Sequence, residues 1–250
     1  MPNISVSVIN ASTAVTDEEC AALTAALQIQ VSRDFAPAWG TDATLVFVPK
    51  TGTPNPSSWW LSILDRTDRL GVAGHHETTS EGLPLAKCFA ATDKMFGLKW
   101  TVTASHELLE MLADPYINLT VFVHPEPGKG TLYAYEICDA CEDDSFSYDI
   151  NGIAVCDFVY PAYFEAARAP NSARFDHLNK LTGPVPALLK GGYINSFDLT
   201  DLTKGWHPVS AAEIPHGPTD RSHMTERSTS RRERRARARS EWRHSTAFPK

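Results

Sequence analysis

The sequence predicts a single α+β domain over residues 1–217, in which a mixed β-sheet packs against two main helices and an irregular C-terminal part follows. Three observations support this class. Several short segments before residue 80 are apolar and rich in β-branched residues, one early segment carries a helix-capping signature, and one strongly apolar segment ends at an Asp-Pro pair. Hydrophobic residues make up 42% of the 250-residue chain, which is enough for one core of ordinary domain size.

The N-terminal elements are a strand followed by a helix. Ile4–Ile9 alternates and contains many β-branched residues, which predicts a strand. Thr16 with Glu19 three positions later is typical of a capping box, and apolar residues then recur at helical spacing. A helix is therefore expected from this point to about Arg33, and Gly40 closes the unit.

Three further strand candidates follow, separated by turns that contain glycine or proline. They are Ala43–Val48, Trp59–Leu64 and Gly71–Thr79. The third contains glycine and histidine, so we expect it at the edge of the sheet, beside a cleft. Its sequence His75-His76-Glu77 either lines that cleft or is polar because it is exposed, and exposure is the interpretation we favour.

The second main helix is expected from about Val102 to Ala113. It should end at Asp114, because the following proline disfavours helical geometry in the residue before it. The remaining expectations are a hairpin of Thr120–Val123 and Thr131–Ile137, a strand at Ile153–Phe158, a short helix at Tyr160–Arg168, and a mixed region up to Glu213.

The second helix carries the pattern H-E-x-x-E, which predicts a metal site. Residues four apart share one face of a helix, so His106 and Glu110 can bind the same cation. Glu107 lies one position further round, where it can act as general base on a water molecule. The neighbouring residues are apolar, so the helix is buried and its adjacent ionisable groups need a compensating charge. A buried salt-bridge network is the alternative.

A third protein ligand must come from another segment, because catalytic zinc sites usually have three. The best source is Tyr135–Asp139, which the hairpin can return to the helix. If this segment is a strand, Glu136 and Cys138 share one face and Asp139 lies on the other. Glu136 and Asp139 therefore compete for the role, and we favour Glu136. Asp114 either supports a ligand from behind or serves only as a helix-end residue.

The phrases HELLEMLADP, YEICDACE and GIAVCDFVYPAYF, with RDFAPAWG, GLPLAKCF and GGYINSF, resemble those of a group of bacterial and phage-associated proteins. That group is similar to zincin metallopeptidases around the motif helix, and the resemblance covers most of residues 1–200. It implies a zincin-like fold and a metallopeptidase-like hydrolase acting on a peptide or protein. His106 matches the first ligand, Glu107 the general base and Glu110 the second ligand, where zincins have histidine. Zinc is the expected cofactor, and this carboxylate-rich set also suits manganese or calcium.

The rival interpretation is a non-catalytic phage-associated or structural protein that keeps the fold and binds partners. Its acidic helix residues would be satisfied by Arg, Lys or backbone donors. The acidic run Glu142-Asp143-Asp144 suggests calcium but lacks the ligand spacing of an EF-hand loop. Cys138 and Cys141 form a lone C-x-x-C, so ordinary reduced cysteines are expected rather than a zinc knuckle. The sequence contains no G-x-S-x-G elbow and no phosphate-binding glycine loop.

Charge is distributed unevenly along the chain. Residues 218–250 contain ten Lys or Arg against four Asp or Glu, a net +6, whereas residues 1–217 contain 13 against 26, a net −13. The basic tail is expected to be disordered and solvated, with nucleic acid or another polyanion as the alternative contact. The acidic body suits a cation-binding protein. The N-terminus resembles neither a signal peptide nor a membrane span, so a cytoplasmic protein, or one released by another route, is expected.

Overall fold

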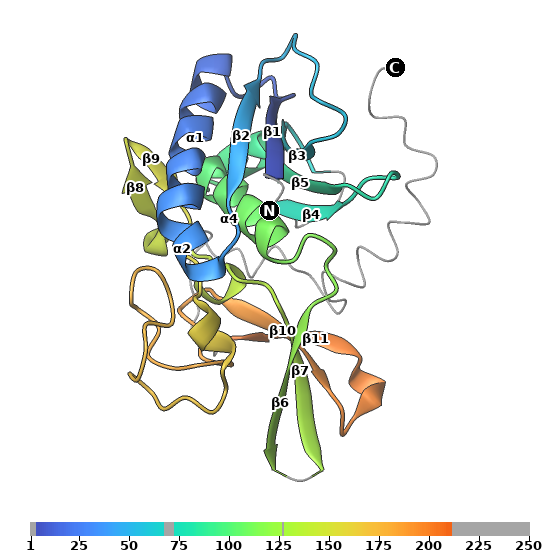
Figure 1. The fold of residues 1–250 in the computed structure, drawn as a ribbon, viewed down its shortest axis with the longest axis vertical. Helices are drawn as coiled ribbons and strands as arrows, with labels where there is room; N and C mark the ends of the chain where they lie inside the picture. The colour runs from blue at the N-terminus through green and yellow to red at the C-terminus, as the bar shows by residue number, and fades with distance from the viewer. Residues whose placement is uncertain (1–3, 68–72, 127, 212–250) are drawn as a thin grey trace.

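The computed structural model describes residues 4–67, 73–126 and 128–211, and within them the predicted α+β class is confirmed (Figure 1). A five-stranded mixed sheet forms one part, and a four-stranded antiparallel sheet forms the other. The expected boundary at residue 217 and the basic tail lie outside the described residues. Among the described helices, none is long and apolar enough to cross a membrane.

The five-stranded sheet has the order β2-β1-β3-β5-β4. Its strands are β1 (Ile4–Asn10), β2 (Ala43–Val48), β3 (Trp59–Leu64), β4 (Gly74–Thr78) and β5 (Pro84–Phe89). The first three and β5 run parallel, whereas β4 pairs with β5 in the antiparallel direction. The predicted edge position of the His-containing strand is therefore confirmed.

Sequence reasoning missed β5 and the short helix α3 (Ala90–Met95) that follows it. All residues of β5 are buried, including Lys87, so the strand shows no alternation of polar and apolar positions. The Lys87 ammonium lies 2.7 Å from a carboxylate oxygen of Glu77 on β4, which offsets the burial of its charge.

The first helical unit extends further than predicted. Helix α1 (Asp17–Ile29) has the expected capping box, in which the Glu19 N–H donates to Thr16 Oγ1 at 3.1 Å and the Thr16 N–H donates to Glu19 Oε2 at 2.7 Å. The helical path continues through a π-helical segment, Gln30–Phe35, and α2 (Ala36–Trp39). It ends at Gly40, whose φ of 72° is left-handed.

Helix α4 (Trp100–Ala113) carries the motif and starts two residues earlier than predicted. In Figure 1 it lies against the five-stranded sheet beside β4 and β5, while α1 covers β1 and β2. It ends at Asp114, whose carboxylate accepts the N–H groups of Asn118 at 3.1 Å and Leu119 at 2.9 Å. These bonds confirm the interpretation of Asp114 as a helix-end residue.

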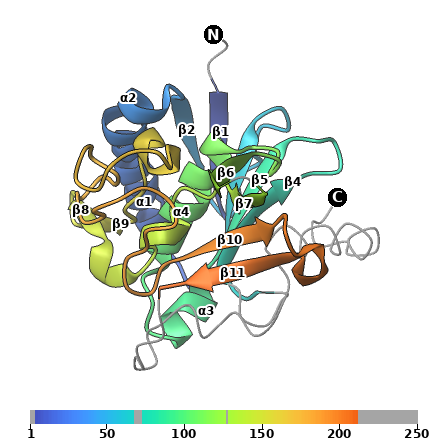
Figure 2. The same ribbon diagram turned by 90° about the horizontal axis from the view of Figure 1, so that it is seen from below.

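The second part of the molecule lies below α4 in Figure 1, and Figure 2 shows β10 and β11 crossing beneath the helix. Its antiparallel sheet has the order β11-β10-β7-β6. The strands are β6 (Thr120–Glu126), β7 (Lys129–Ala134), β10 (Tyr193–Asp198) and β11 (Trp206–Ser210). A separate hairpin of β8 (Tyr148–Ile150) and β9 (Ile153–Val155) packs on α4 and α1. Most of the predicted helix at Tyr160–Arg168 is absent, because only Pro161–Phe164 forms a 3-10 turn.

Candidate metal centre

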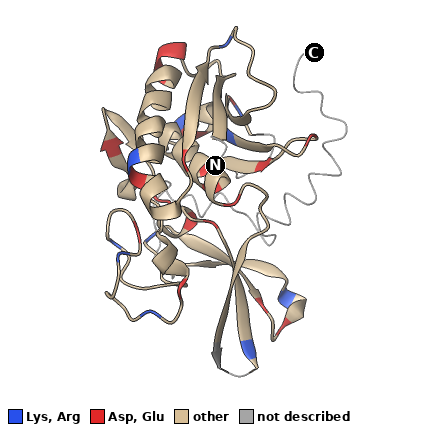
Figure 3. Ribbon diagram, viewed as in Figure 1, with Lys and Arg blue, Asp and Glu red and all other residues tan. Residues whose placement is uncertain are grey.

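Seven ionisable side chains meet where α4 faces β4 and the segment that follows β7. Each is 4% exposed or less. We call them the His–carboxylate cluster; its members are His76, His106, Glu107, Glu110, Glu136, Asp139 and Glu142. In Figure 3, acidic residues colour the chain where the segment after β7 passes close to α4. Taking this many charged groups out of water is costly unless charge of the opposite sign accompanies them.

The motif helix places its first and last motif residues together, as predicted. His106 Nε2 lies 3.2 Å from Glu110 Oε2 and 3.2 Å from Asp139 Oδ1. Two ligand atoms bonded to one tetrahedral zinc, at about 2.0–2.1 Å each, lie roughly 3.3 Å apart. The spacing of these donor pairs therefore matches that of neighbouring ligands of a common cation.

The edge strand adds a histidine that sequence reasoning did not place in the site. His76 Nδ1 lies 3.6 Å from Glu107 Oε2 and 3.8 Å from Glu110 Oε2. The favoured interpretation of His75-His76-Glu77 as exposed is wrong for the two histidines, which are 3% and 0% exposed. They lie at the end of β4 that α4 covers, so the strand lines the site instead of facing solvent. The available signal was a histidine pair on a predicted edge strand.

Gly74 sets the distance between β4 and α4. A Cβ atom at this position would lie 2.7 Å from Glu107 Cγ and 2.7 Å from Thr103 Cγ2, closer than real Cβ contacts allow. Only glycine lets the strand approach the helix this closely without displacement of either. The strand therefore holds the carboxylate of Glu107 in a fixed position.

The segment after β7 does not continue as a strand. β7 ends at Ala134, and the chain turns into a 3-10 helix at Asp139–Cys141. The segment is not a strand, so the prediction that Glu136 and Asp139 lie on opposite faces of a strand is wrong. Both side chains are part of the cluster. The turn is fixed from outside by the Leu189 N–H, which donates to Ala140 O at 2.9 Å.

Potential ligand atoms fall into three overlapping groups, in each of which all atoms lie within 4.8 Å of one another. The groups are His106, Glu110 and Cys138; His76, Glu110 and Glu136; and His106, Asp139 and Glu142. The two candidates for the third ligand thus belong to different groups. His76, Cys138 and Glu142 were not predicted as ligands, although Glu142 stands in the acidic run noted in the sequence.

Burial and charge pull the protonation of the two α4 ligands in opposite directions. Burial disfavours a charged imidazole, but the carboxylates of Glu110 and Asp139 outweigh it and raise the pKa of His106 well above its ordinary value. Burial also disfavours a charged carboxylate, and it therefore raises the pKa of Glu110. The charge of His106 lowers this pKa, whereas the nearby carboxylates of Asp139 and Glu136 raise it further. In both cases the nearby carboxylates favour the protonated form of the side chain.

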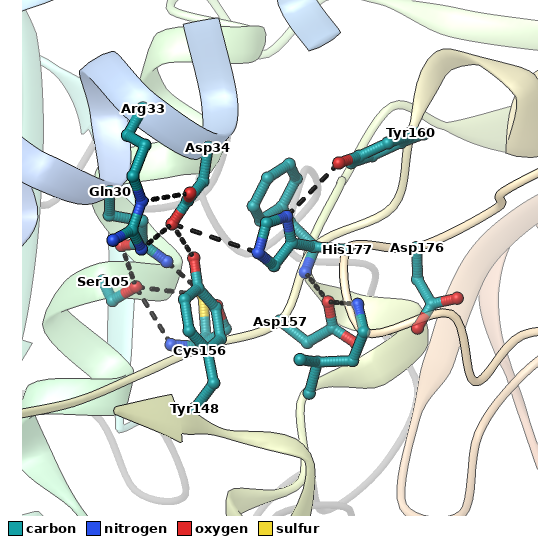
Figure 4. A network of polar contacts seen from close by, with 12 residues as sticks. Gln30, Arg33, Asp34, Ser105, Tyr148, Cys156, Asp157, Tyr160, Asp176 and His177 are labelled. Atoms are coloured by element: carbon teal, nitrogen blue, oxygen red, sulfur yellow. Dashed lines mark hydrogen bonds and ion pairs between the residues drawn. The ribbon is translucent and has the colours of Figure 1, made fainter. Parts of the chain in front are cut away.

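A neutral hydrogen-bond network behind α4 fixes the rotation of the helix (Figure 4). The Ser105 hydroxyl donates to Gln30 Oε1 at 2.7 Å, and the Cys156 N–H donates to Ser105 Oγ at 3.1 Å. Gln30 Nε2 completes the network by donating to Cys156 O at 3.0 Å. Because Ser105 is held on this side, His106 and Glu110 are directed to the opposite side, toward β4 and the segment after β7.

Glu136 connects the cluster to a small cleft between the two parts of the molecule. The cleft is lined by Asp114, Tyr135, Glu136, Asn195 and Trp206, among others. Two of these residues belong to β10 and β11, and Asp114 is the end of α4. Glu136 is therefore the member of the cluster that also lines this cleft. The motif residues His106, Glu107 and Glu110 lie deeper and are at most 1% exposed.

Comparison of the chain with protein-family models, with curated proteins and with solved structures gave no match.

Proposed function

We propose that the His–carboxylate cluster binds a divalent cation and that the protein is a metal-dependent hydrolase, similar to zincin metallopeptidases. The observation that carries the proposal is the position of His106 Nε2, 3.2 Å from carboxylate oxygens of both Glu110 and Asp139. The cluster contains five carboxylates and two imidazoles, all buried, so its acidic groups outnumber its basic ones. A bound cation offsets this excess.

The topology supports the zincin-like part of the proposal. The motif helix lies beside a mixed sheet whose edge strand β4 is antiparallel to its neighbour and contacts the helix. The element order, with a strand–helix unit and further strands before the motif helix, is the one that the resemblance of the sequence implies. The second sheet lies below α4 in Figure 1, and the cleft at Glu136 is lined by residues of both parts.

The chain's own residues have distinct roles in this mechanism. A divalent cation, with zinc the first choice and manganese or calcium also suited to these donors, supplies Lewis acidity that activates a water molecule. Glu107 would accept a proton from that water as the water adds to the carbonyl of a peptide or protein substrate, and would pass the proton to the leaving amine as the C–N bond breaks. Gly74 and His76 hold the Glu107 carboxylate in position. His106 and Glu110 bind the cation, together with Glu136 or Asp139.

A second candidate function is favoured by the burial of the site. Glu107 is only 1% exposed, so a substrate carbonyl reaches it only if neighbouring residues move. If that movement does not occur, the cation stabilises a non-catalytic binding or structural protein, in line with the phage-associated resemblance. The two candidates share the metal site and differ only in turnover.

The test compares metal content and turnover in the wild type, His106→Ala and Glu107→Gln. Protein purified without added metal is analysed for bound metals, and cleavage of an unstructured protein is measured. We expect the wild type to hold metal and His106→Ala to lose both metal and activity. Glu107→Gln should keep metal and lose activity by about a hundred to ten-thousandfold. Arg168→Gln, an exposed change far from the motif, serves as the control.

Each other outcome has a definite meaning. Metal content near zero in the wild type, unchanged in His106→Ala, would overturn the proposal. Bound metal without cleavage supports the non-catalytic candidate. Loss of metal in Glu107→Gln as complete as in His106→Ala would make Glu107 a ligand and remove the general base from the mechanism.

A further inference from the structure

The donor groups of the His–carboxylate cluster include two sets of the same composition. One is His76, Glu110 and Glu136, and the other is His106, Asp139 and Glu142. Each set contains one imidazole and two carboxylates, and the two share no residue. From this we propose that the cluster is a two-cation centre, with Glu110 as the ligand that bridges the two positions. The inference rests on the proposed function, because it assigns the number of cations in the same site.

Glu110 is placed to act as the bridge. Its Oε2 atom lies 3.2 Å from His106 Nε2 and 3.8 Å from His76 Nδ1, so the two imidazoles approach the same carboxylate oxygen. Its Oε1 atom accepts the Cys138 N–H at 3.2 Å, which orients the carboxylate. A carboxylate has enough lone pairs to bind two cations, whereas a neutral imidazole offers one nitrogen. This gives a physical reason for glutamate at the position where the H-E-x-x-H motif has histidine.

Counted over its seven side chains alone, the charge of the cluster also fits two cations better than one. Its five carboxylates carry a charge of −5 when ionised, and both imidazoles are neutral when they act as ligands. One divalent cation leaves −3 on these seven side chains, whose burial makes excess charge costly. Two leave −1, the charge of the Glu107 carboxylate that the hydrolytic mechanism needs as a base. Two-cation centres of hydrolytic enzymes are built in this way from carboxylates and histidines.

The second set is held in place by contacts that do not involve its ligand atoms. Glu142 lies between two anchored residues: Ala140 O accepts the Leu189 N–H at 2.9 Å, and Asp144 Oδ2 accepts the Lys99 N–H at 2.8 Å. Lys99 is the residue before the first turn of α4. The segment with Asp139 and Glu142 is therefore attached to the helix that presents His106, so the second position is preorganised without a metal.

The experiment counts cations per chain in the full-length protein. Metal-free protein is titrated with Mn²⁺ or Zn²⁺, the bound metal is measured after desalting, and the Mn²⁺-loaded protein is examined by electron paramagnetic resonance. We expect two equivalents in the wild type and a spectrum of two exchange-coupled Mn²⁺ ions. Glu142→Gln should lose one equivalent and the coupled spectrum, and so should Glu136→Gln from the other set. Glu81→Gln, an exposed change, should keep both.

Glu110→His separates the bridge from an ordinary ligand. It restores the H-E-x-x-H pattern, and we expect it to hold at most one equivalent and to show no coupled spectrum. One equivalent in the wild type would overturn the two-cation inference and leave the proposed function standing, whereas none would overturn both. Circular dichroism shows whether each variant is folded. If the variants fail to fold, the count and spectrum of the wild type still decide the question.

Discussion

Two groups of buried acidic residues lie close to α4, and their carboxylates are stabilised in different ways. The first is the pair Asp157 and Asp176, both fully buried. Asp157 Oδ1 accepts the N–H groups of Phe158 at 2.8 Å and Leu178 at 3.1 Å. Burial raises the pKa of Asp157 to about 9, and its hydrogen bond with Asp176 adds to the increase. Asp176 Oδ1 in turn accepts the Lys180 N–H at 2.9 Å.

The second group is the His–carboxylate cluster, whose carboxylates face imidazole nitrogens. The Asp157–Asp176 pair is neutralised in part by a proton and oriented by the backbone, so it needs nothing from outside the chain. The cluster concentrates five carboxylates around two imidazoles. The comparison teaches that burial of acidic residues alone does not indicate a metal site. The arrangement of nitrogen and oxygen donors at ligand spacing distinguishes the second group from the first.

Removal of metal should act on the His–carboxylate cluster only. A ligand present at a hundred to a thousand times its Kd stabilises the folded state by about 3–4 kcal/mol. We therefore expect a chelator to lower the Tm of the wild type and of Asp157→Asn by similar amounts. His106→Ala, which should hold no metal, should not respond. Equal responses of His106→Ala and the wild type in thermal unfolding would break the comparison.

Gly74→Ala tests the packing that positions Glu107. The new methyl group would overlap Glu107 Cγ and Thr103 Cγ2, and overpacking of this kind costs about 1–3 kcal/mol. Turnover should fall further than metal content, because the new methyl group displaces the Glu107 side chain, whereas neither His106 nor Glu110 is among its nearest neighbours. Gly183→Ala is the matched control, since its Cβ would lie 3.8 Å from its nearest neighbour, Ala187 Cβ. Urea unfolding that gives the same free energy for both variants would contradict the prediction.

Asp157→Asn should produce an effect that depends on pH. The raised pKa of Asp157 means that the folded state binds its proton more tightly than the unfolded state, whose carboxyl titrates near 4. The contribution of this proton to the free energy of unfolding is complete below pH 4 and is lost as the pH rises toward 9. Asparagine keeps the hydrogen bonds without the titration. The stability of Asp157→Asn relative to the wild type should therefore increase from pH 5 to pH 9.

Thermal unfolding at several pH values measures this difference. A constant offset between the two proteins across the range would show that Asp157 does not titrate as proposed. The metal content of Asp157→Asn should match that of the wild type, because the pair lies outside the cluster.

The fold could be predicted where a segment carries a clear local signal, such as a run of apolar and β-branched residues or a capping box. β1, β2 and β3 were located closely, and the capping box of α1 gave the start of that helix. β5 could not be recognised because both of its faces are buried and its lysine forms an ion pair inside the protein. β10 was missed in a region that contains only short elements between turns. In each case tertiary contacts, which a single segment does not reveal, decide the structure.

Part of the site could be predicted for a similar reason. Helical spacing alone places His106 beside Glu110, and their separation of 3.2 Å agrees with the prediction. The contribution of His76 depends on strand order, since β4 lies next to α4 only because β5 pairs with it. The turn at Asp139–Cys141 depends on contacts with residues near 189, far along the chain. Neither fact is encoded in local spacing.

The wide sequence separation of the cluster has a kinetic consequence. Its members extend from residue 76 to residue 142, and the network that orients α4 joins Gln30 to Cys156. Contacts between such distant residues form late in folding, since the entropy of closing long loops must be overcome first. A cation that needs the completed cluster is then bound only after the rate-limiting step. It should slow unfolding and leave the refolding rate unchanged. Stopped-flow measurements with and without chelator can separate the two rates, and a slower refolding without metal would place assembly of the cluster before the barrier.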